Sequence, residues 1–154
     1  MRKATLGVAF LFAVMLTNPI LAKAESEPSP STKIYLALAD EHERPLAFEK
    51  KSFDCTEKIF AVAELKHFPK GKHEFSVRWI DPADTVREHT RYPFHVHNED
   101  TRLWSWLSLR RGAGAGMLQW LDPSAGLEEF IGPWTVEVHI DGKQLASLTM
   151  EVNC

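Results

Sequence analysis

The chain has 154 residues, 44% of them hydrophobic and 25% charged, and its 18 basic and 21 acidic residues give a net charge of -3. This length suits one domain with a hydrophobic core of its own. The acidic balance argues against a nucleic-acid partner and against binding to an anionic membrane surface, because both depend on a positive field.

Residues 1–24 have the pattern of a secretory signal peptide. Arg2 and Lys3 form a positive start, residues 6–16 form a short apolar run, and residues 22–24 match an Ala-x-Ala cleavage pattern. The apolar run is shorter than the roughly 20 residues that span a membrane as a helix, so no integral span is expected after cleavage. An uncleaved N-terminal anchor is the alternative. Cleavage would leave 15 basic against 21 acidic residues, a net charge of −6, in a periplasmic or secreted protein.

The first half of the predicted mature chain alternates strands with turns. Residues 25–33 are rich in Pro and Ser and predict a flexible leader, followed by one domain over 34–154. Strands are predicted at 34–39, 59–65 and 73–80, and the clearest of them alternates Phe75, Val77 and Trp79 with polar residues. Residues 48–54 read as a short irregular or extended piece. For 59–65 a helix is the alternative, because Ala, Glu and Leu favour it.

The polar segment 85–96 predicts an edge strand, since Pro93 cannot donate to a central ladder. Its sequence His95-Val96-His97 places two imidazoles on one strand face, where they could bind one zinc or copper ion. His89 or His139 could add a third ligand, and Met117 or Met150 a soft one for copper. The alternative is a solvated edge strand with two chance histidines.

Residues 102–110 predict a strand that is apolar on both faces. Its two tryptophans, Trp104 and Trp106, lie on one face. Its three leucines lie on the other face: Leu103, Leu107 and Leu109. If the leucines face the core, the indoles stand on the outer sheet, where they could stack a sugar ring or anchor a protein partner. Otherwise the indoles are core, or a neighbouring loop covers them.

Arg110 and Arg111 lead into the glycine-rich segment 112–116. A phosphate cradle needs a following helix that opens with Lys-Ser or Lys-Thr, and Met117 to Trp120 supply neither. A flexible loop is therefore predicted. Together with the two tryptophans, the two arginines complete the candidate binding surface, because loops of this kind often carry recognition.

Residues 130–152 predict a closing β-hairpin. Trp134, Val136, Val138 and Ile140 alternate with polar residues, and Asp141-Gly142 favours a type I′ turn. The return strand then places four apolar residues on one face, Ala146, Leu148, Met150 and Val152. About seven short strands separated by turns predict an all-β, immunoglobulin-like antiparallel sandwich.

Cys55 and Cys154 both lie in the predicted mature chain. An even pair in an exported protein predicts a disulfide, and the sequence has no Cys-x-x-Cys that would favour a redox pair. A metal site is the alternative. In an immunoglobulin-like topology the start of the second strand and the end of the last lie at the same end of the sandwich, so the pairing is geometrically plausible.

The run PKGKHEFSVRWIDP (69–82) and the later run GPWTVEVHIDGKQLASLTMEV (132–152) resemble uncharacterised bacterial exported domains with an immunoglobulin-like sandwich. The shared features are a Gly-x-His turn that opens a strand ending in Trp-x-x-Pro, and a final hairpin with Gly-x-Trp and Asp-Gly. The resemblance implies the fold and export. It transfers no catalytic residue, and sandwiches serve many functions.

The predicted function is that of an exported, non-catalytic binding or protein-interaction module of the bacterial cell envelope, with another envelope protein as its partner and no cofactor. Gly-x-Ser-x-Gly and His-Glu-x-x-His are absent from the sequence, and a disulfide would leave no thiol nucleophile. The alternatives are a periplasmic copper- or zinc-binding protein that uses His95 and His97, and a carbohydrate-binding accessory domain.

Overall fold

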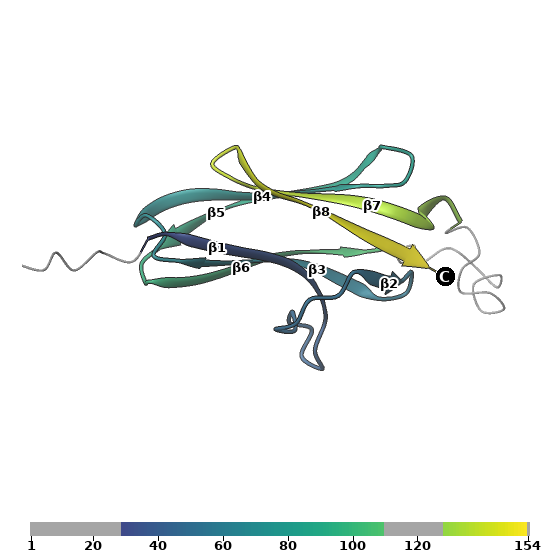
Figure 1. Ribbon diagram of the computed structural model, residues 1–154, viewed down its shortest axis with the longest axis horizontal. Helices are drawn as coiled ribbons and strands as arrows, with labels where there is room; N and C mark the ends of the chain where they lie inside the picture. Colours follow the sequence, from purple (N-terminus) through teal and green to yellow (C-terminus); the bar gives the residue numbers. More distant parts are fainter. Residues whose placement is uncertain (1–28, 110–127, 154) are drawn as a thin grey trace, which may run out of the picture.

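The computed structural model describes residues 29–109 and 128–153, which form two β-sheets packed face to face (Figure 1). The three-stranded sheet has the order β1 (Ser31–Leu38), β3 (Lys58–Lys66) and β6 (Asp100–Ser108). The five-stranded sheet has the order β2 (Ser52–Asp54), β8 (Lys143–Asn153), β7 (Gly132–Ile140), β4 (Gly71–Ile80) and β5 (Val86–Val96). A short 3-10 helix, η1 (Glu128–Phe130), precedes β7. No helix in the described ranges has the length and apolar character needed to cross a membrane.

The strand order confirms the predicted immunoglobulin-like sandwich. In the lettering of that fold, β1, β3 and β6 are strands A, B and E, whereas β8, β7, β4 and β5 are G, F, C and C′. Every pairing is antiparallel except that of β2 with β8, which is parallel. A constant-type domain has a strand D beside E, and among the described residues no strand occupies that position next to β6.

The described residues form eight strands where about seven were predicted, and the additional one is β2. It lies in the segment that was expected to be irregular or extended. Its three residues pair with residues 151–153 of β8. Three residues are too few to establish a period-2 pattern, so only the tertiary pairing defines this strand. The first strand also differs, since β1 begins at Ser31, inside the predicted leader.

The main core lies between the two sheets. Its largest fully buried members include Trp79 and Phe75 of β4 and Trp134 of β7, with Ile59 and Leu65 of β3. The predicted inward face of β4 is therefore confirmed. On the hairpin Trp134, Val136, Val138 and Ile140 are buried, as predicted, together with Met150 and Val152, whereas Ala146 and Leu148 are half-buried.

A second apolar cluster lies on the other face of the three-stranded sheet. It consists of Tyr35 and Ala37 of β1 with Phe60 and Val62 of β3, all at most 1% exposed. The segment between β1 and β2 folds back beside β1, and in Figure 1 it extends below the sheet. Its backbone N–H groups at 46 and 50 donate to the carbonyls of residues 38 and 36 at 2.9 and 2.8 Å. The outer edge of β1 is covered in this way.

The turns of the sandwich follow from local chemistry. Asp141 and Gly142 have φ angles of 52° and 76°, which confirms a turn with two positive φ values. Gly132 has a φ of 122°, and a Cβ there would lie 3.5 Å from Pro82 Cγ. Trp134 then donates its indole N–H to the carbonyl of Phe130 at 2.8 Å. The Gly-x-Trp and Trp-x-x-Pro motifs are thus structural.

His73 fastens the start of β4 to the hairpin turn. Its Nδ1 lies 2.7 Å from Asp141 Oδ2, and its Nε2 lies 2.9 Å from the carbonyl oxygen of Pro69. A carbonyl only accepts, so Nε2 carries a proton, and a second proton on Nδ1 satisfies the carboxylate. The hydrogen bond to Asp141 raises the pKa of His73, and the same bond, aided by the N–H of Glu74, lowers the pKa of Asp141.

These shifts predict a stability maximum in mildly acidic solution. The His73 contribution is complete below its usual pKa of 6.5 and is lost as the pH rises through the higher folded pKa. The Asp141 contribution is present above its usual pKa of 3.8 and is lost as the pH falls through the lower folded value. Thermal unfolding of the wild type and His73→Gln across pH 3–9 measures this dependence. We expect the variant to lose the decline above pH 6.5, and parallel profiles would contradict the prediction.

Candidate binding surface on strand β6

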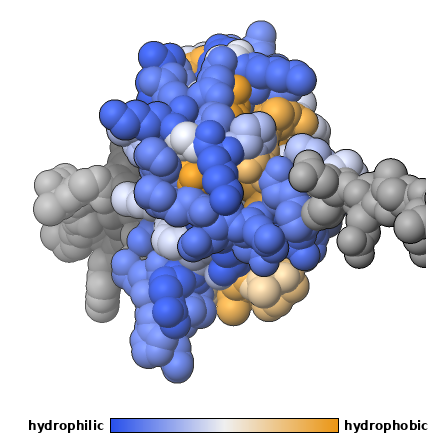
Figure 2. Space-filling model, turned by 90° about the vertical axis from the view of Figure 1, so that its left-hand side faces the viewer, coloured by the Kyte–Doolittle hydropathy of each residue, from blue (hydrophilic) through white to orange (hydrophobic). Residues whose placement is uncertain are grey.

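The ends of the sandwich and its faces differ in character. The end seen in Figure 2, which carries the β3–β4 and β5–β6 turns, is mostly hydrophilic, with hydrophobic side chains limited to small areas. The largest exposed aromatic side chains lie elsewhere, on the outer face of the three-stranded sheet. Trp104 is 41% exposed and Trp106 is 51% exposed, whereas Leu103 and Leu107 of the same strand are each 7% exposed.

The register of the sheet explains why the indoles stand outside. Trp104 pairs with Val62 and Trp106 pairs with Phe60, so both tryptophans continue the outer apolar cluster across the sheet. The leucines that flank them, Leu103 and Leu107, enter the main core. Because β6 is the last strand of its sheet, the indoles have a buried neighbour on one side and solvent on the other. The structure thus brings together the two tryptophans of the predicted surface.

Trp106 forms one wall of a first hollow of about 530 Å³. The hollow is lined by Leu38, Ala39, Asp40, Glu43, Thr56, Glu57, Lys58, Trp106 and Ser108. The Lys58 ammonium lies 4.5 Å from the centre of the Trp106 ring and 3.0 Å from Glu43 Oε2, so one indole face already meets a cation.

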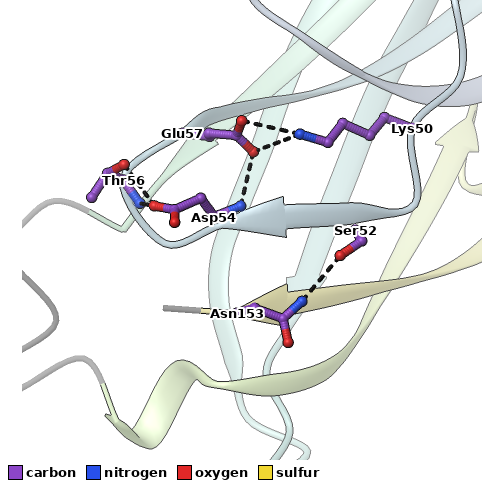
Figure 3. Close-up of polar contacts among 6 residues, drawn as sticks. All are labelled: Lys50, Ser52, Asp54, Thr56, Glu57 and Asn153. Carbon is purple, nitrogen blue, oxygen red and sulfur yellow. Dashed lines mark hydrogen bonds and ion pairs between the residues drawn. The ribbon is translucent and has the colours of Figure 1, made fainter.

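The polar wall of this hollow is held by the turn after β2, shown in Figure 3. Glu57 accepts hydrogen bonds from Lys50 Nζ at 2.9 Å and from the N–H of Asp54 at 2.8 Å. The backbone N–H and the hydroxyl of Thr56 both donate to Asp54 Oδ1, at 2.8 and 2.6 Å. The hydrogen bond from the Thr56 hydroxyl, with that from its N–H, lowers the pKa of Asp54. These contacts fix the turn, and its residues Thr56 and Glu57 line the hollow.

A second hollow of about 610 Å³ lies between the edges of the two sheets. Its lining residues are Glu88, Thr90 and Tyr92 of β5, with residues 104–108 of β6. The Tyr92 hydroxyl donates to the carbonyl of Trp104 at 3.0 Å and accepts from its N–H at 3.2 Å. Ser105 donates to the hydroxyl of Thr90 at 2.7 Å. Burial raises the pKa of Tyr92, and these side chains join the two sheets at their open side.

The Tyr92 hydroxyl supplies a stability prediction. Tyr92→Phe removes two hydrogen bonds to the backbone of β6 while keeping the ring against Phe75, whose centroid lies 5.3 Å away. We expect the free energy of unfolding to fall by about 1–2 kcal/mol, because each intramolecular hydrogen bond contributes about 1 kcal/mol. Urea denaturation of both proteins measures the change. Identical midpoints would contradict the contribution assigned to these bonds.

The other predicted residues are distributed as follows. Arg110 and Arg111, predicted to extend the surface, lie outside the described residues, as do Met117 and Cys154.

The rings of His95 and His97 are exposed and stacked, with centroids 4.1 Å apart and planes inclined by 10°. An imidazole binds a metal in its own ring plane, and two parallel planes at this spacing do not share one ion. This arrangement does not favour the metal-binding alternative.

The additional metal ligands predicted within the described residues, His89, His139 and Met150, are not near this histidine pair. His89 lies six residues from His95 along β5, about 20 Å in an extended strand. Met150 is 1% exposed in the main core, and His139 lies on β7, a different strand of the sheet. Within the ranges that the structure describes, no three His, Cys, Asp or Glu side chains gather where they could hold a metal ion.

Cys55 lies at the end of the domain where β2 meets β8. It is 2% exposed, and its N–H donates to the carbonyl of Asn153 at 2.9 Å. Asp54 and Asn153 are register partners, and Asn153 Nδ2 donates to the Ser52 hydroxyl at 3.0 Å (Figure 3). Cys55 therefore contacts the residue that precedes Cys154 in the sequence. The disulfide between the two cysteines stays a prediction, and this contact supports it.

Sequence reasoning missed one buried polar cluster, centred on Asp81. Its carboxylate accepts from the N–H groups of Ala83 and Thr85 at 2.9 and 2.8 Å and pairs with Arg87 Nε. Desolvation raises the pKa of Asp81, but the hydrogen bonds from Thr85, Arg87 and Ala83 together outweigh it and lower the pKa. Arg87 also lies over the ring of Phe130. An Asp before Pro signals only a turn, so the sequence offered no sign of burial.

Comparison with known proteins adds three structures at low identity. Neither a protein-family model nor a curated protein matches the chain. An immunoglobulin-like protein from Pseudomonas aeruginosa is 9% identical, with a TM-score of 0.46, over 83% of this chain and 99% of that one. The alkylpurine DNA glycosylase AlkC of Pseudomonas fluorescens, bound to DNA containing an abasic-site analogue, is 10% identical, with a TM-score of 0.45.

The third structure is a β-glucosidase from Listeria innocua in complex with glucose, 12% identical, with a TM-score of 0.43. The similarity covers 81% of this chain but 16% of the glucosidase, and 80% of this chain but 30% of the glycosylase. The chain therefore spans only a small part of either enzyme. The class assigned here, an immunoglobulin-like sandwich, rests on the strand order described above.

Proposed function

We propose that this protein is an exported, non-catalytic binding module of the bacterial cell envelope, and that the outer face of β6 contacts another envelope protein. The observation that carries the proposal is the exposure of Trp104 and Trp106 on one strand face, between two hollows. Tryptophan is costly to leave in water and is enriched where protein interfaces concentrate their binding energy.

The remaining polar groups support a binding role over catalysis. Among the described residues, those with shifted pKa values serve turns, the hairpin or the junction of the sheets, as Asp54, His73, Asp81, Tyr92 and Asp141 do. Tyr35, whose pKa burial raises, donates to Glu64 at 2.7 Å on the sheet. The described residues that line the two hollows include no histidine and no cysteine.

Site-specific photo-cross-linking in cells tests the proposal. A cross-linking residue at Ser108, next to the indoles, should capture a discrete partner, because Ser108 lines both hollows. The same residue at Ser147, exposed on β8 of the other sheet, serves as the matched control position. We expect capture from position 108 to disappear in the double variant Trp104→Ser/Trp106→Ser. Capture that is equal from both positions, or that survives the double substitution, would contradict the proposal.

Carbohydrate binding is a second candidate, favoured by the first hollow. It combines the Trp106 indole with hydroxyl and carboxylate groups of Thr56, Glu57 and Ser108, a combination that suits a sugar ring. Titration of soluble glycans against tryptophan fluorescence tests it. Because Trp106 lines both hollows and Trp104 lines only the second, Trp106→Ala should abolish such binding and Trp104→Ala should preserve it. Equal losses would contradict a sugar site in the first hollow.

A further inference from the structure

We propose that β6 binds an extended peptide with a basic side chain, which adds as a fourth strand beside residues 106–108 and fills the hollow between β5 and β6. This inference rests on the proposed function and specifies the partner of the same surface. It follows from three features of the described residues: the outward-facing backbone groups of Trp106 and Ser108, an edge of β6 that no other described strand covers, and the charge of the hollow.

The backbone of β6 presents hydrogen-bonding groups toward the hollow. The N–H and the carbonyl of Trp104 both face away from β3, because the Tyr92 hydroxyl contacts both of them. Backbone direction alternates along a strand, so the N–H and carbonyl of Trp106 and of Ser108 face the same way. The other edge of the sheet confirms this alternation, since the carbonyls of Leu36 and Leu38 face outward and accept from residues 50 and 46.

The described edges of the two sheets differ in how they are protected. Residues 46–50 cover part of β1, and β2 is only three residues long. Strand β5 carries Pro93 and several charged side chains, which are common means of blocking further pairing. By contrast, the β6 stretch Trp-Ser-Trp-Leu-Ser has neither a proline nor a charge. An uncharged stretch of an edge strand, with exposed tryptophans, is a template for β-strand addition.

The charge of the hollow selects the peptide. Glu88 is exposed, and among the described residues that line the hollow it is the one carboxylate and none is cationic. The adjacent indole faces are favourable positions for a cation, as Lys58 shows at 4.5 Å from the Trp106 ring. An extended peptide whose lysine or arginine lies between Glu88 and the indoles satisfies both groups. A second copy of this acidic chain would instead bring a second Glu88 and additional like charge to the same edge.

Defined synthetic peptides test the inference on the full mature chain. The probe is an eight-residue peptide of alternating lysine and valine, compared with the same peptide N-methylated at alternate residues and with a glutamate-valine analogue. We expect saturable binding of the first peptide with a change in tryptophan fluorescence, and slower hydrogen exchange at the N–H of Trp106. N-methylation removes donors from one edge of the peptide and should weaken binding at least about tenfold, as should the change to glutamate.

Two protein variants separate the contribution of the Glu88 charge from that of the net charge of the protein. Glu88→Gln should weaken binding of the lysine peptide about fivefold, the loss of roughly one exposed charge contact. Glu99→Gln, in the turn between β5 and β6, makes the same change in net charge outside the hollow and should leave the affinity unchanged. Both glutamate residues are exposed, so neither substitution changes the packing of the core.

The outcomes distinguish this inference from the proposed function. If N-methylated and unmodified peptides bind equally, or the two glutamine variants weaken binding equally, strand addition at the hollow is refuted. Concentration-dependent dimerisation through β6, detected by sedimentation, would refute it in favour of a second copy. In both cases, tryptophan-dependent cross-linking from position 108 would leave the proposed function intact. Loss of that cross-linking as well would refute both.

Discussion

Replacing Cys55 and Cys154 together by alanine is expected to lower the free energy of unfolding by about 2–5 kcal/mol. The predicted bond would close a loop of about 100 residues, and a loop of this length restricts the unfolded chain strongly. The native chain needs little distortion to form it, because the N–H of Cys55 already donates to the carbonyl of Asn153 at 2.9 Å. Guanidinium unfolding with and without a reductant measures the effect.

The reductant supplies the matched control for this prediction. Reduction should destabilise the wild type to nearly the level of the double alanine variant and should leave that variant unchanged. Alkylation followed by mass measurement of the unfolded, non-reduced wild type should detect no free thiol. Two alkylated cysteines, or a wild type insensitive to reductant, would contradict the disulfide.

Asp81→Ala is expected to lower the free energy of unfolding by about 2–4 kcal/mol, because each buried donor left without an acceptor costs about 1–3 kcal/mol, whereas the Arg87 side chain, 33% exposed, is screened by solvent. The carboxylate is fully buried and serves the N–H groups of Ala83 and Thr85 as well as Arg87. Its removal leaves these donors without an acceptor, and Arg87 retains only the weaker contact with Glu129 at 3.4 Å. Chemical denaturation of the wild type and the variant measures the loss.

A matched pair of substitutions isolates this carboxylate from the rest of the turn. Asp81→Asn keeps an acceptor oxygen but removes the charge, and should cost about 1–3 kcal/mol. Asp84→Asn makes the same change three residues away at an exposed position with a φ of 59°, which asparagine tolerates, and should cost less than about 0.5 kcal/mol. Equal effects at the two positions would contradict the role assigned to Asp81.

Because the pKa of Asp81 is lowered, its contribution to the free energy of unfolding should persist above its usual pKa of 3.8 and disappear as the pH falls through the lower folded pKa.

The fold was largely predictable because apolar and polar residues alternate along β4 and β7. Phe75, Val77 and Trp79 of β4 and the matching residues of β7 specify their buried faces without tertiary information. Strand β3 is buried on both faces, so its pattern left a helix open, and only its pairing with β1 and β6 decides. The three residues of β2 have no pattern of their own.

The candidate site was predictable only in part, because both faces of β6 are apolar. Periodicity places Trp104 and Trp106 together but does not say which face meets the opposite sheet. The outcome depends on register, since Leu103 and Leu107 align with the inward Ala63 and Ile59 of β3. The hollow beside Glu88 depends on two strand edges from different sheets, and no local signal encodes their distance.

The parallel pairing of β2 with β8 also governs when the domain can become complete. Ser52 pairs with Glu151, a partner about 100 residues later, and contacts of such high sequence separation form slowly. Until β8 has docked, β2 and β7 lack the strand that lies between them, so a partly synthesised chain holds only an incomplete five-stranded sheet. The five-stranded sheet can therefore close only after β8 is available, an order that suits the export proposed above.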